Sequence, residues 1–250
     1  MQEPVNFAFL HGGGQGGWVW DQTIAALDGQ TNGAFGRALA LDVPGCGTKR
    51  GRLTDNLDNA DVARELIADI ERAGMNDVIL VGHSQAGQVM PFMAGMRPTL
   101  VRRLIYVTCS IPLAGQSVLQ MMGDGRQGIS ENEVGFPFDP KTETILEKYP
   151  LMFCNDMSPE QTASFVGKLG QDSWPPKTYT FRKWPYDYFG IVPASYVICL
   201  RDNILPTGWQ RRFADRFKAE RQICIDAGHQ VMNTRPNTLA EALLIEATTA

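Results

Sequence analysis

The chain has 250 residues, of which 44% are hydrophobic and 20% are charged, and 23 basic against 27 acidic side chains give a formal net charge of −4 at pH 7. This composition fits a soluble globular protein with a sizeable core and excludes a disordered chain. No apolar run approaches the ~18 residues of a membrane-spanning helix, and the absence of a basic run disfavours nucleic acid or an anionic membrane as a partner.

The first half of the chain alternates short apolar runs with amphipathic stretches. Strands are predicted at residues 6–10, 37–41, 78–81 and 103–109, and helices at 20–27, 58–73 and 85–96. In the second of these helices Val62, Leu66 and Ile70 recur every four residues and form one apolar face. Pro91 is expected to bend the third helix.

The last third of the chain resumes this alternation. Strands are predicted at residues 194–200 and 222–225, and helices at 207–217 and 237–247. Continuous apolar strands separated by helices indicate an α/β fold with a mainly parallel sheet that helices cover on both faces.

The middle of the chain, residues 111–192, breaks the pattern and is rich in Met, Phe, Trp, Pro and Gly. A compact domain does not accommodate about 80 residues of structureless loop, and Ser158 followed by Pro159 and Glu160 is typical of a helix start. We therefore expect residues 111–192 to form a mostly helical cap inserted into a core made of residues 1–110 and 193–250.

A serine lies at the turn between the predicted strand 78–81 and the helix after it, in the segment VILVGHSQAG at 78–87. So tight a turn needs small residues two positions to either side of Ser84, and Gly82 and Ala86 meet that need. The helix that follows points its positive end at the turn, which favours developing negative charge. Ser84 is therefore the candidate nucleophile, the alternative being an ordinary strand-to-helix turn that contains a serine.

The chain has three histidines, His11, His83 and His229. His83 is next to Ser84 and is expected to point away from it, and His11 is expected to hold the loop after the first strand by hydrogen bonding. His229 follows the last strand, and the carboxyl ends of parallel strands meet at one edge of a sheet. His229 is therefore the candidate general base.

A base of this kind needs a carboxylate at its other ring nitrogen. Asp202 follows the strand 194–200 and should reach the same edge of the sheet. Asp226 is only three residues before His229 and is expected to cap its own turn. The alternative for Asp202 is a surface aspartate without a catalytic part.

Five glycines follow the first strand, in HGGGQGGW at 11–18. Glycine lets a backbone approach a ligand closely, and acyl transfer needs two N–H donors for the oxygen that becomes negative. We assign these donors to the main-chain N–H groups of Gly13 and Gln85. A phosphate loop is disfavoured, because no Gly-Lys-Ser/Thr and no dinucleotide-type glycine pattern with a ribose-binding acid is present. A simple loop is the remaining alternative.

The motifs together resemble those of the α/β-hydrolase superfamily, and in particular its small lidded branch of plant methylesterases, hydroxynitrile lyases and bacterial pyrethroid-type esterases. The matching segments are FLHGG at 9–13, LDVPGCG at 41–47, VGHSQAG at 81–87, RDNI at 201–204 and GH at 228–229. The resemblance implies the order Ser, Asp, His along the chain and a sheet of about six strands.

Departures from the family narrow the activity. Hydroxynitrile lyases of the branch carry a lysine directly after the triad histidine and a hydroxyl residue after the first-strand histidine, where this chain has Gln230 and Gly12. Epoxide hydrolases and dehalogenases of the superfamily have an aspartate at the place of Ser84. Cofactor-free oxygenases of the fold place a histidine where Ala86 stands. All three activities are therefore disfavoured.

The resulting hypothesis is a serine hydrolase that cleaves a carboxylic ester or lactone of a small to medium apolar substrate, aromatic ones included. Gly12, Ile204 and Met121 are the predicted substrate contacts. A carbon–carbon bond hydrolase or lyase on the same triad and a non-catalytic ligand receptor are the alternatives. No metal and no organic cofactor is expected, the partner is a small molecule, and the protein is expected to be a monomer or a homodimer.

The cysteines favour a reduced protein. Their number is odd, their spacing is wide and no C-x-x-C occurs, which disfavours a disulfide framework or a zinc site. The five are Cys46, Cys109, Cys154, Cys199 and Cys224. Cys109, Cys199 and Cys224 are expected in the core. The start Met-Gln-Glu-Pro lacks the features of a signal peptide, so we expect a cytoplasmic protein.

Overall fold

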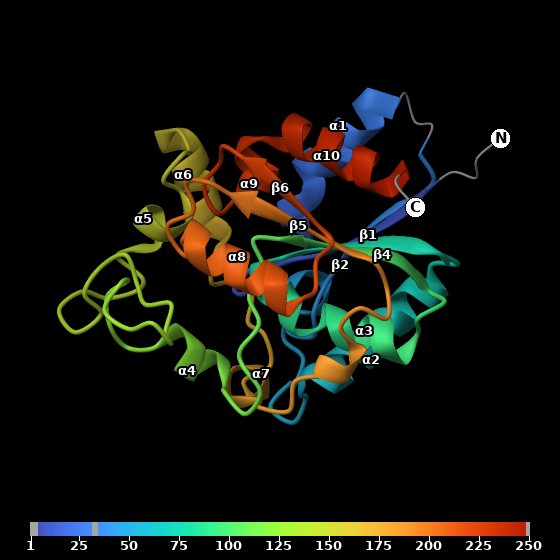
Figure 1. The fold of residues 1–250 in the computed structure, drawn as a ribbon. Helices are drawn as coiled ribbons and strands as arrows, with labels where there is room; N and C mark the ends of the chain where they lie inside the picture. The colour runs from blue at the N-terminus through green and yellow to red at the C-terminus, as the bar shows by residue number, and fades with distance from the viewer. Residues whose placement is uncertain (1–4, 32–34, 249–250) are drawn as a thin grey trace.

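A six-stranded sheet forms the centre of the protein (Figure 1). The computed structural model describes residues 5–31 and 35–248. The strand order is β2-β1-β3-β4-β5-β6, and every neighbouring pair is parallel. The strands are β1 (Asn6–Leu10), β2 (Ala38–Leu41), β3 (Val78–His83), β4 (Val101–Val107), β5 (Ala194–Cys199) and β6 (Arg221–Ile225). The predicted α/β class with a parallel sheet is thus confirmed.

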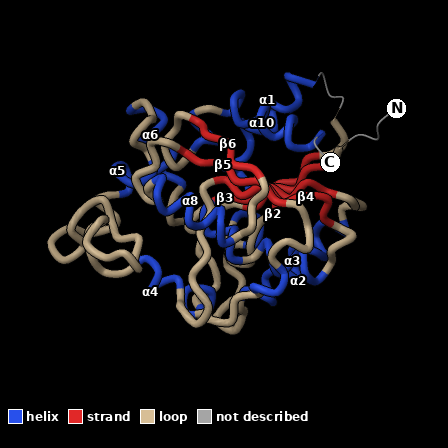
Figure 2. Tube along the Cα trace, in the orientation of Figure 1, coloured by secondary structure: helices blue, strands red, loops and turns tan. Residues whose placement is uncertain are grey.

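Helices cover both faces of the sheet, as Figures 1 and 2 show. One layer holds α1 (Asp21–Thr31) and α10 (Pro236–Thr248), and the other holds α2 (Asn59–Arg72), α3 (Met90–Met96) and α8 (Thr207–Arg216). Successive residues of β3 serve the two layers in turn: Ile79 belongs to the apolar cluster that contains Leu243 of α10, and Leu80 to the cluster that contains Leu66 of α2. Both faces of the sheet are therefore core.

The helix α2 illustrates how local sequence sets these elements. The Asp58 carboxylate accepts hydrogen bonds from the N–H groups of Ala60 and Asp61, and the Asp61 carboxylate accepts one from the Asp58 N–H. This reciprocal cap begins the helix. The predicted apolar face of Val62, Leu66 and Ile70 is fully buried.

The helix predicted at 85–96 is divided in two. A 3-10 helix, η3 (Ser84–Gln88), follows β3 directly, and α3 begins only at Met90. The break falls at Val89 because Pro91 has no N–H and its ring does not fit inside a continuous helix, whereas it is tolerated in a first turn. The proline thus starts a new helix where a bend was expected.

The chain between β4 and β5, which we call the inserted segment (residues 108–193), lies at the carboxyl edge of the sheet (Figure 1). It contains α4 (Val118–Met122), α5 (Tyr149–Phe153), α6 (Pro159–Lys168), α7 (Lys177–Thr180) and the 3-10 helix η4 (Tyr186–Tyr188). Turns and irregular stretches occupy most of the rest (Figure 2). The segment is less helical than expected because prolines and glycines recur throughout it and end helices early.

Three further short helices lie near the strand ends, namely η1 (Gly17–Trp20), η2 (Gly47–Lys49) and α9 (Val231–Thr234). None of the helices in residues 5–31 and 35–248 combines the length and the apolar character that crossing a membrane requires.

Four of the five cysteines are buried, namely Cys46, Cys109, Cys154 and Cys199, whereas Cys224 is exposed. Burial raises the pKa of the Cys154 thiol to about 11 and raises those of the other three buried thiols further. The expectation that Cys224 lies in the core is wrong, because β6 is an edge strand whose residues alternate between the interior and solvent.

We expect one thiol per chain to react rapidly with Ellman's reagent in the native protein and all five to react in denaturant, because Cys224 is exposed and the other four cysteines are buried. Cys224→Ser should abolish the rapid phase, and Cys154→Ser should leave it intact. A second rapidly reacting thiol in the native protein would contradict the structure.

Candidate active site

Ser84 lies on the turn between β3 and η3 with a backbone φ of +54°. This left-handed conformation costs a residue other than glycine about 1–3 kcal/mol. The turn is crowded: a Cβ at position 82 would lie 2.2 Å from Met90 Sδ and 2.8 Å from Ala86 Cβ. Glycine at 82 and alanine at 86 therefore make room for the turn, which leaves Ser84 partly exposed between buried neighbours.

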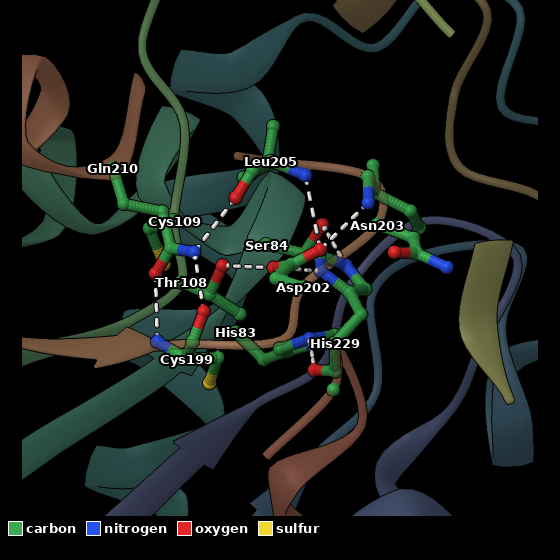
Figure 3. A network of polar contacts seen from close by, with 12 residues as sticks. His83, Ser84, Thr108, Cys109, Cys199, Asp202, Asn203, Leu205, Gln210 and His229 are labelled. Carbon is green, nitrogen blue, oxygen red and sulfur yellow. Dashed lines mark hydrogen bonds and ion pairs between the residues drawn. The ribbon is translucent and has the colours of Figure 1, made fainter. Parts of the chain in front are cut away.

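The structure brings Ser84, His229 and Asp202 together (Figure 3). His229 Nε2 lies 3.0 Å from Ser84 Oγ, and His229 Nδ1 lies 2.7 Å from Asp202 Oδ2. An ionised carboxylate only accepts hydrogen bonds, so the ring proton of neutral His229 is on Nδ1 and Nε2 is free to accept from the serine hydroxyl. His229 is completely buried and Asp202 is 7% exposed. This arrangement can activate a hydroxyl as a nucleophile.

Asp202 is held by more groups than the sequence indicated. Its Oδ1 accepts hydrogen bonds from the N–H groups of Ile204 and Leu205 at 2.7 and 2.9 Å, and its Oδ2 also accepts one from Thr108 Oγ1 at 2.5 Å (Figure 3). Thr108 has a left-handed φ of +39°, which is rare for a β-branched residue. Its place directly after β4, at the shared strand edge, is the one signal that could have revealed it.

The loop that carries Asp202 is fixed from α8. The buried side chain of Gln210 accepts a hydrogen bond from the Cys199 N–H and donates to the carbonyls of Cys199 and Leu205. Asp226 forms an ion pair with Arg201 at 2.7 Å, so it braces the neighbouring loop and is separate from the Ser84 constellation.

His83 points away from the Ser84 hydroxyl and supports His229 from behind. Its Nε2 lies 3.0 Å from the carbonyl oxygen of His229, which only accepts, so Nε2 is the donor. Burial lowers the pKa of His83 well below its ordinary value, so the ring is neutral at pH 7.

His11 holds the loop after β1. The Val43 N–H donates to His11 Nε2 at 3.2 Å, so the proton of the neutral ring is on Nδ1, which donates to the Gly12 carbonyl at 2.8 Å. Burial lowers the pKa of His11. The loop approaches the serine turn closely, because a Cβ at position 12 would lie 3.0 Å from Ser84 Cβ and 2.9 Å from His83 Nδ1.

The two N–H groups predicted to bind an oxyanion belong to this loop and to η3. Gln85 is the second residue of η3, so its N–H has no acceptor within that helix. Among the described residues, the N–H of Gly13 has no backbone acceptor either. The Gln85 side chain lies against Gly13, since a Cβ there would be 2.4 Å from Gln85 Oε1. Gly13 thus lies next to Gln85, the residue that follows Ser84, and the role of the two N–H groups stays a prediction.

The predicted substrate contacts have different surroundings. Ile204 is 8% exposed and lies in the loop of Asp202, whereas Met121 is 1% exposed and belongs to the apolar cluster beneath the inserted segment. The ring of Phe153 lies 5.8 Å from that of His229. Burial raises the pKa of Tyr179, and a hydrogen bond with the Gln85 side chain opposes this rise.

Within the described residues, no three His, Cys, Asp or Glu side chains are grouped so that they could hold a metal ion.

Comparisons with known proteins all point to alpha/beta hydrolases or esterases. A model of the alpha/beta hydrolase family matches residues 7–242. The chain is 27% identical over 252 residues to the carbendazim hydrolyzing esterase of a Nocardioides species, covering 96% of this chain and 98% of that protein. It is 26% identical over 253 residues to methylesterase 7 of Arabidopsis thaliana, covering 96% and 95%.

Among solved structures, an extracellular alpha/beta-hydrolase from a Paenibacillus species superimposes with a TM-score of 0.77 at 20% identity, covering 99% of this chain and all of that chain. At this identity the likeness shows a common fold.

We expect Gly12→Ala to lower the free energy of unfolding by about 1–3 kcal/mol, because its Cβ would overlap two fixed neighbours, Ser84 and His83. Gly29→Ala is the matched control, because Gly29 lies in α1 and an added Cβ would have no atom within 4 Å. Alanine favours a helix more than glycine does, so the free energy of unfolding of this variant should rise by up to about 1 kcal/mol. Chemical denaturation of both variants measures the difference. Equal stabilities would show that the loop has room at position 12.

Proposed function

Because the chain belongs to the alpha/beta hydrolase family, we propose that it is a serine-dependent carboxylic ester hydrolase. The observation that carries this proposal is the hydrogen-bonded series from Ser84 through His229 to Asp202, with separations of 3.0 and 2.7 Å. Similarity to proteins named as esterases supports the ester as the bond that is cleaved.

In the first half-reaction Ser84 Oγ attacks the carbonyl carbon of the ester while His229 Nε2 takes the hydroxyl proton. The electron pair of the carbonyl π bond moves to oxygen, which accepts hydrogen bonds from the N–H groups of Gly13 and Gln85. Asp202 stabilises the charged imidazole. The bond to the leaving alcohol then breaks, the alcohol takes the proton from His229, and the acyl group remains on Ser84.

In the second half-reaction water replaces the alcohol. His229 removes a proton from the water as its oxygen attacks the acyl carbon, and the same two N–H groups hold the new oxyanion. When the carbon–oxygen bond to Ser84 breaks, His229 returns the proton to the serine. The products are a carboxylic acid and the regenerated enzyme.

The surroundings of Ser84 favour a small to medium apolar substrate, aromatic esters and lactones included. Phe153 stands beside His229, and the half-buried Tyr179 and the buried Gln85 side chain supply a few polar groups that can orient a ligand. Ile204 and Met121 are the further contacts that we propose on the basis of the sequence.

We expect Ser84→Ala to lower kcat on aryl esters by at least ~10³-fold, because the variant has no nucleophile for the first half-reaction. The measurement is a series of aryl esters of increasing acyl chain length. Ser164→Ala, which changes an exposed serine of α6, is the matched control and should leave turnover unchanged. Wild-type turnover by Ser84→Ala would show that Ser84 is not the nucleophile. Binding without turnover by the unmodified protein would indicate a receptor, and products of carbon–carbon cleavage would indicate the alternative enzyme.

We expect a graded response from the residues behind His229. Asp202→Asn should lower kcat ~10⁴-fold by favouring the wrong tautomer of His229. Thr108→Val removes one of four hydrogen bonds to the Asp202 carboxylate and should lower kcat roughly tenfold with little change in KM. Thr144→Val, at an exposed position of the inserted segment, serves as the control. An unchanged kcat for Asp202→Asn would show that Asp202 is not the carboxylate that supports His229.

A further inference from the structure

The indole of Trp174 connects the inserted segment to the loop after β1. Its Nε1–H donates a hydrogen bond to the Gly12 carbonyl at 3.0 Å across 162 residues of sequence, and the side chain is 1% exposed. The same carbonyl accepts the Nδ1–H of His11 at 2.8 Å, and the two rings meet edge to face at 85°. Both lone pairs of the Gly12 oxygen are therefore occupied.

The carbonyl of Gly12 and the N–H of Gly13 belong to one peptide group. Every described peptide bond is trans, so this C=O and this N–H point in opposite directions. A peptide between two glycines has no side chain to fix it and can rotate between two orientations at little cost. In the reversed orientation the carbonyl would take the place of the N–H and repel an oxyanion. The donors to the Gly12 oxygen decide which orientation is occupied.

We propose that Trp174 is a positioning residue that keeps the Gly13 N–H directed at the oxyanion. This inference rests on the proposed function. His11 donates one hydrogen bond to the Gly12 carbonyl from within the loop, and Trp174 donates the second from the inserted segment.

The chain around Trp174 is anchored firmly enough for this role. We call residues 170–174 the strap. The Gly170 N–H donates to the Gly14 carbonyl at 3.1 Å, and the Ser173 N–H donates to the Gly45 carbonyl at 3.3 Å. Between them the Asp172 carboxylate, whose side chain is fully buried, accepts hydrogen bonds from the Gly47 N–H, the Trp18 indole and the Arg50 guanidinium.

The charge of Asp172 persists at neutral pH. Burial alone would raise the pKa of this carboxyl, but the hydrogen bonds from Arg50, the Gly47 N–H and Trp18 lower it below its ordinary value. The strap thus holds the indole against the Gly12 carbonyl from a fixed point on the loop that follows β2.

The test compares two tryptophans of the inserted segment. Trp174→Phe keeps an aromatic ring and removes the N–H donor. Trp184→Phe removes the same kind of bond, from Trp184 Nε1 to the Gln116 carbonyl at 2.7 Å, away from Ser84. We expect Trp174→Phe to lower kcat on an aryl ester ~10- to 100-fold with KM changed less than twofold, and Trp184→Phe to leave both constants unchanged.

A second readout separates positioning from general damage. An aryl trifluoromethyl ketone adds to Ser84 and places an oxyanion between the two N–H donors, so its inhibition constant should rise in Trp174→Phe by the factor that kcat/KM falls. Binding of the alcohol product, which carries no negatively charged oxygen, should not change. Wild-type kcat in Trp174→Phe, or equal weakening of inhibitor and product, would overturn the inference while leaving the role of Ser84 intact. An inactive unmodified protein would instead overturn the proposed function.

Asp172→Asn provides an independent variant in case Trp174→Phe does not fold. It leaves the indole in place and weakens the anchor of the strap, so kcat and inhibitor affinity should fall together, by less than in Trp174→Phe. Unchanged kcat in a variant whose thermal unfolding shows a loosened structure would contradict the role of the strap.

Discussion

The common direction of the six strands is the constraint on which the site depends. Because all strands run the same way, the loops that leave their carboxyl ends meet at one edge of the sheet. The loops after β1, β3, β4, β5 and β6 supply Gly12, Ser84, Thr108, Asp202 and His229 respectively. Ser84 and His229 are 145 residues apart in sequence and 3.0 Å apart in space. A reversal of any of these strands would carry its residue to the opposite edge.

Burial and hydrogen-bond partners give the three histidines separate tasks. His11 and His83 are buried, neutral at pH 7, and each donates to a main-chain carbonyl, of Gly12 in one case and of His229 in the other. His229 faces a carboxylate on one side and the partly exposed Ser84 hydroxyl on the other. Two imidazoles therefore fix backbone, and the third is arranged to exchange a proton under the proposed mechanism.

The sequence predicts most of the fold, since apolar periodicity and the order of the motifs locate all six strands and the family match confirms the resemblance. It also names Ser84, His229 and Asp202, because each follows a strand. Contacts that depend on tertiary arrangement escape it. The place of Thr108 after a strand puts it at the shared edge, but nothing in the local sequence indicates its bond to Asp202. Trp174 lies in a segment without apolar periodicity and is 162 residues from Gly12 in sequence. The exposure of an edge strand such as β6 depends on strand order, which local sequence does not contain.

The anchoring of residues 170–174 to the loops after β1 and β2 restricts how this protein can diverge. The sequence of a segment inserted between two strands is commonly free to vary, because the segment makes few contacts with the rest of the domain. Here residues 170–174 lie at the carboxyl edge of the sheet and form hydrogen bonds to residues in both 14–18 and 45–50. A chimaera that received residues 108–193 from a relative would need matching loops from the same donor. New ligand preferences and the rigidity of that edge must therefore evolve together.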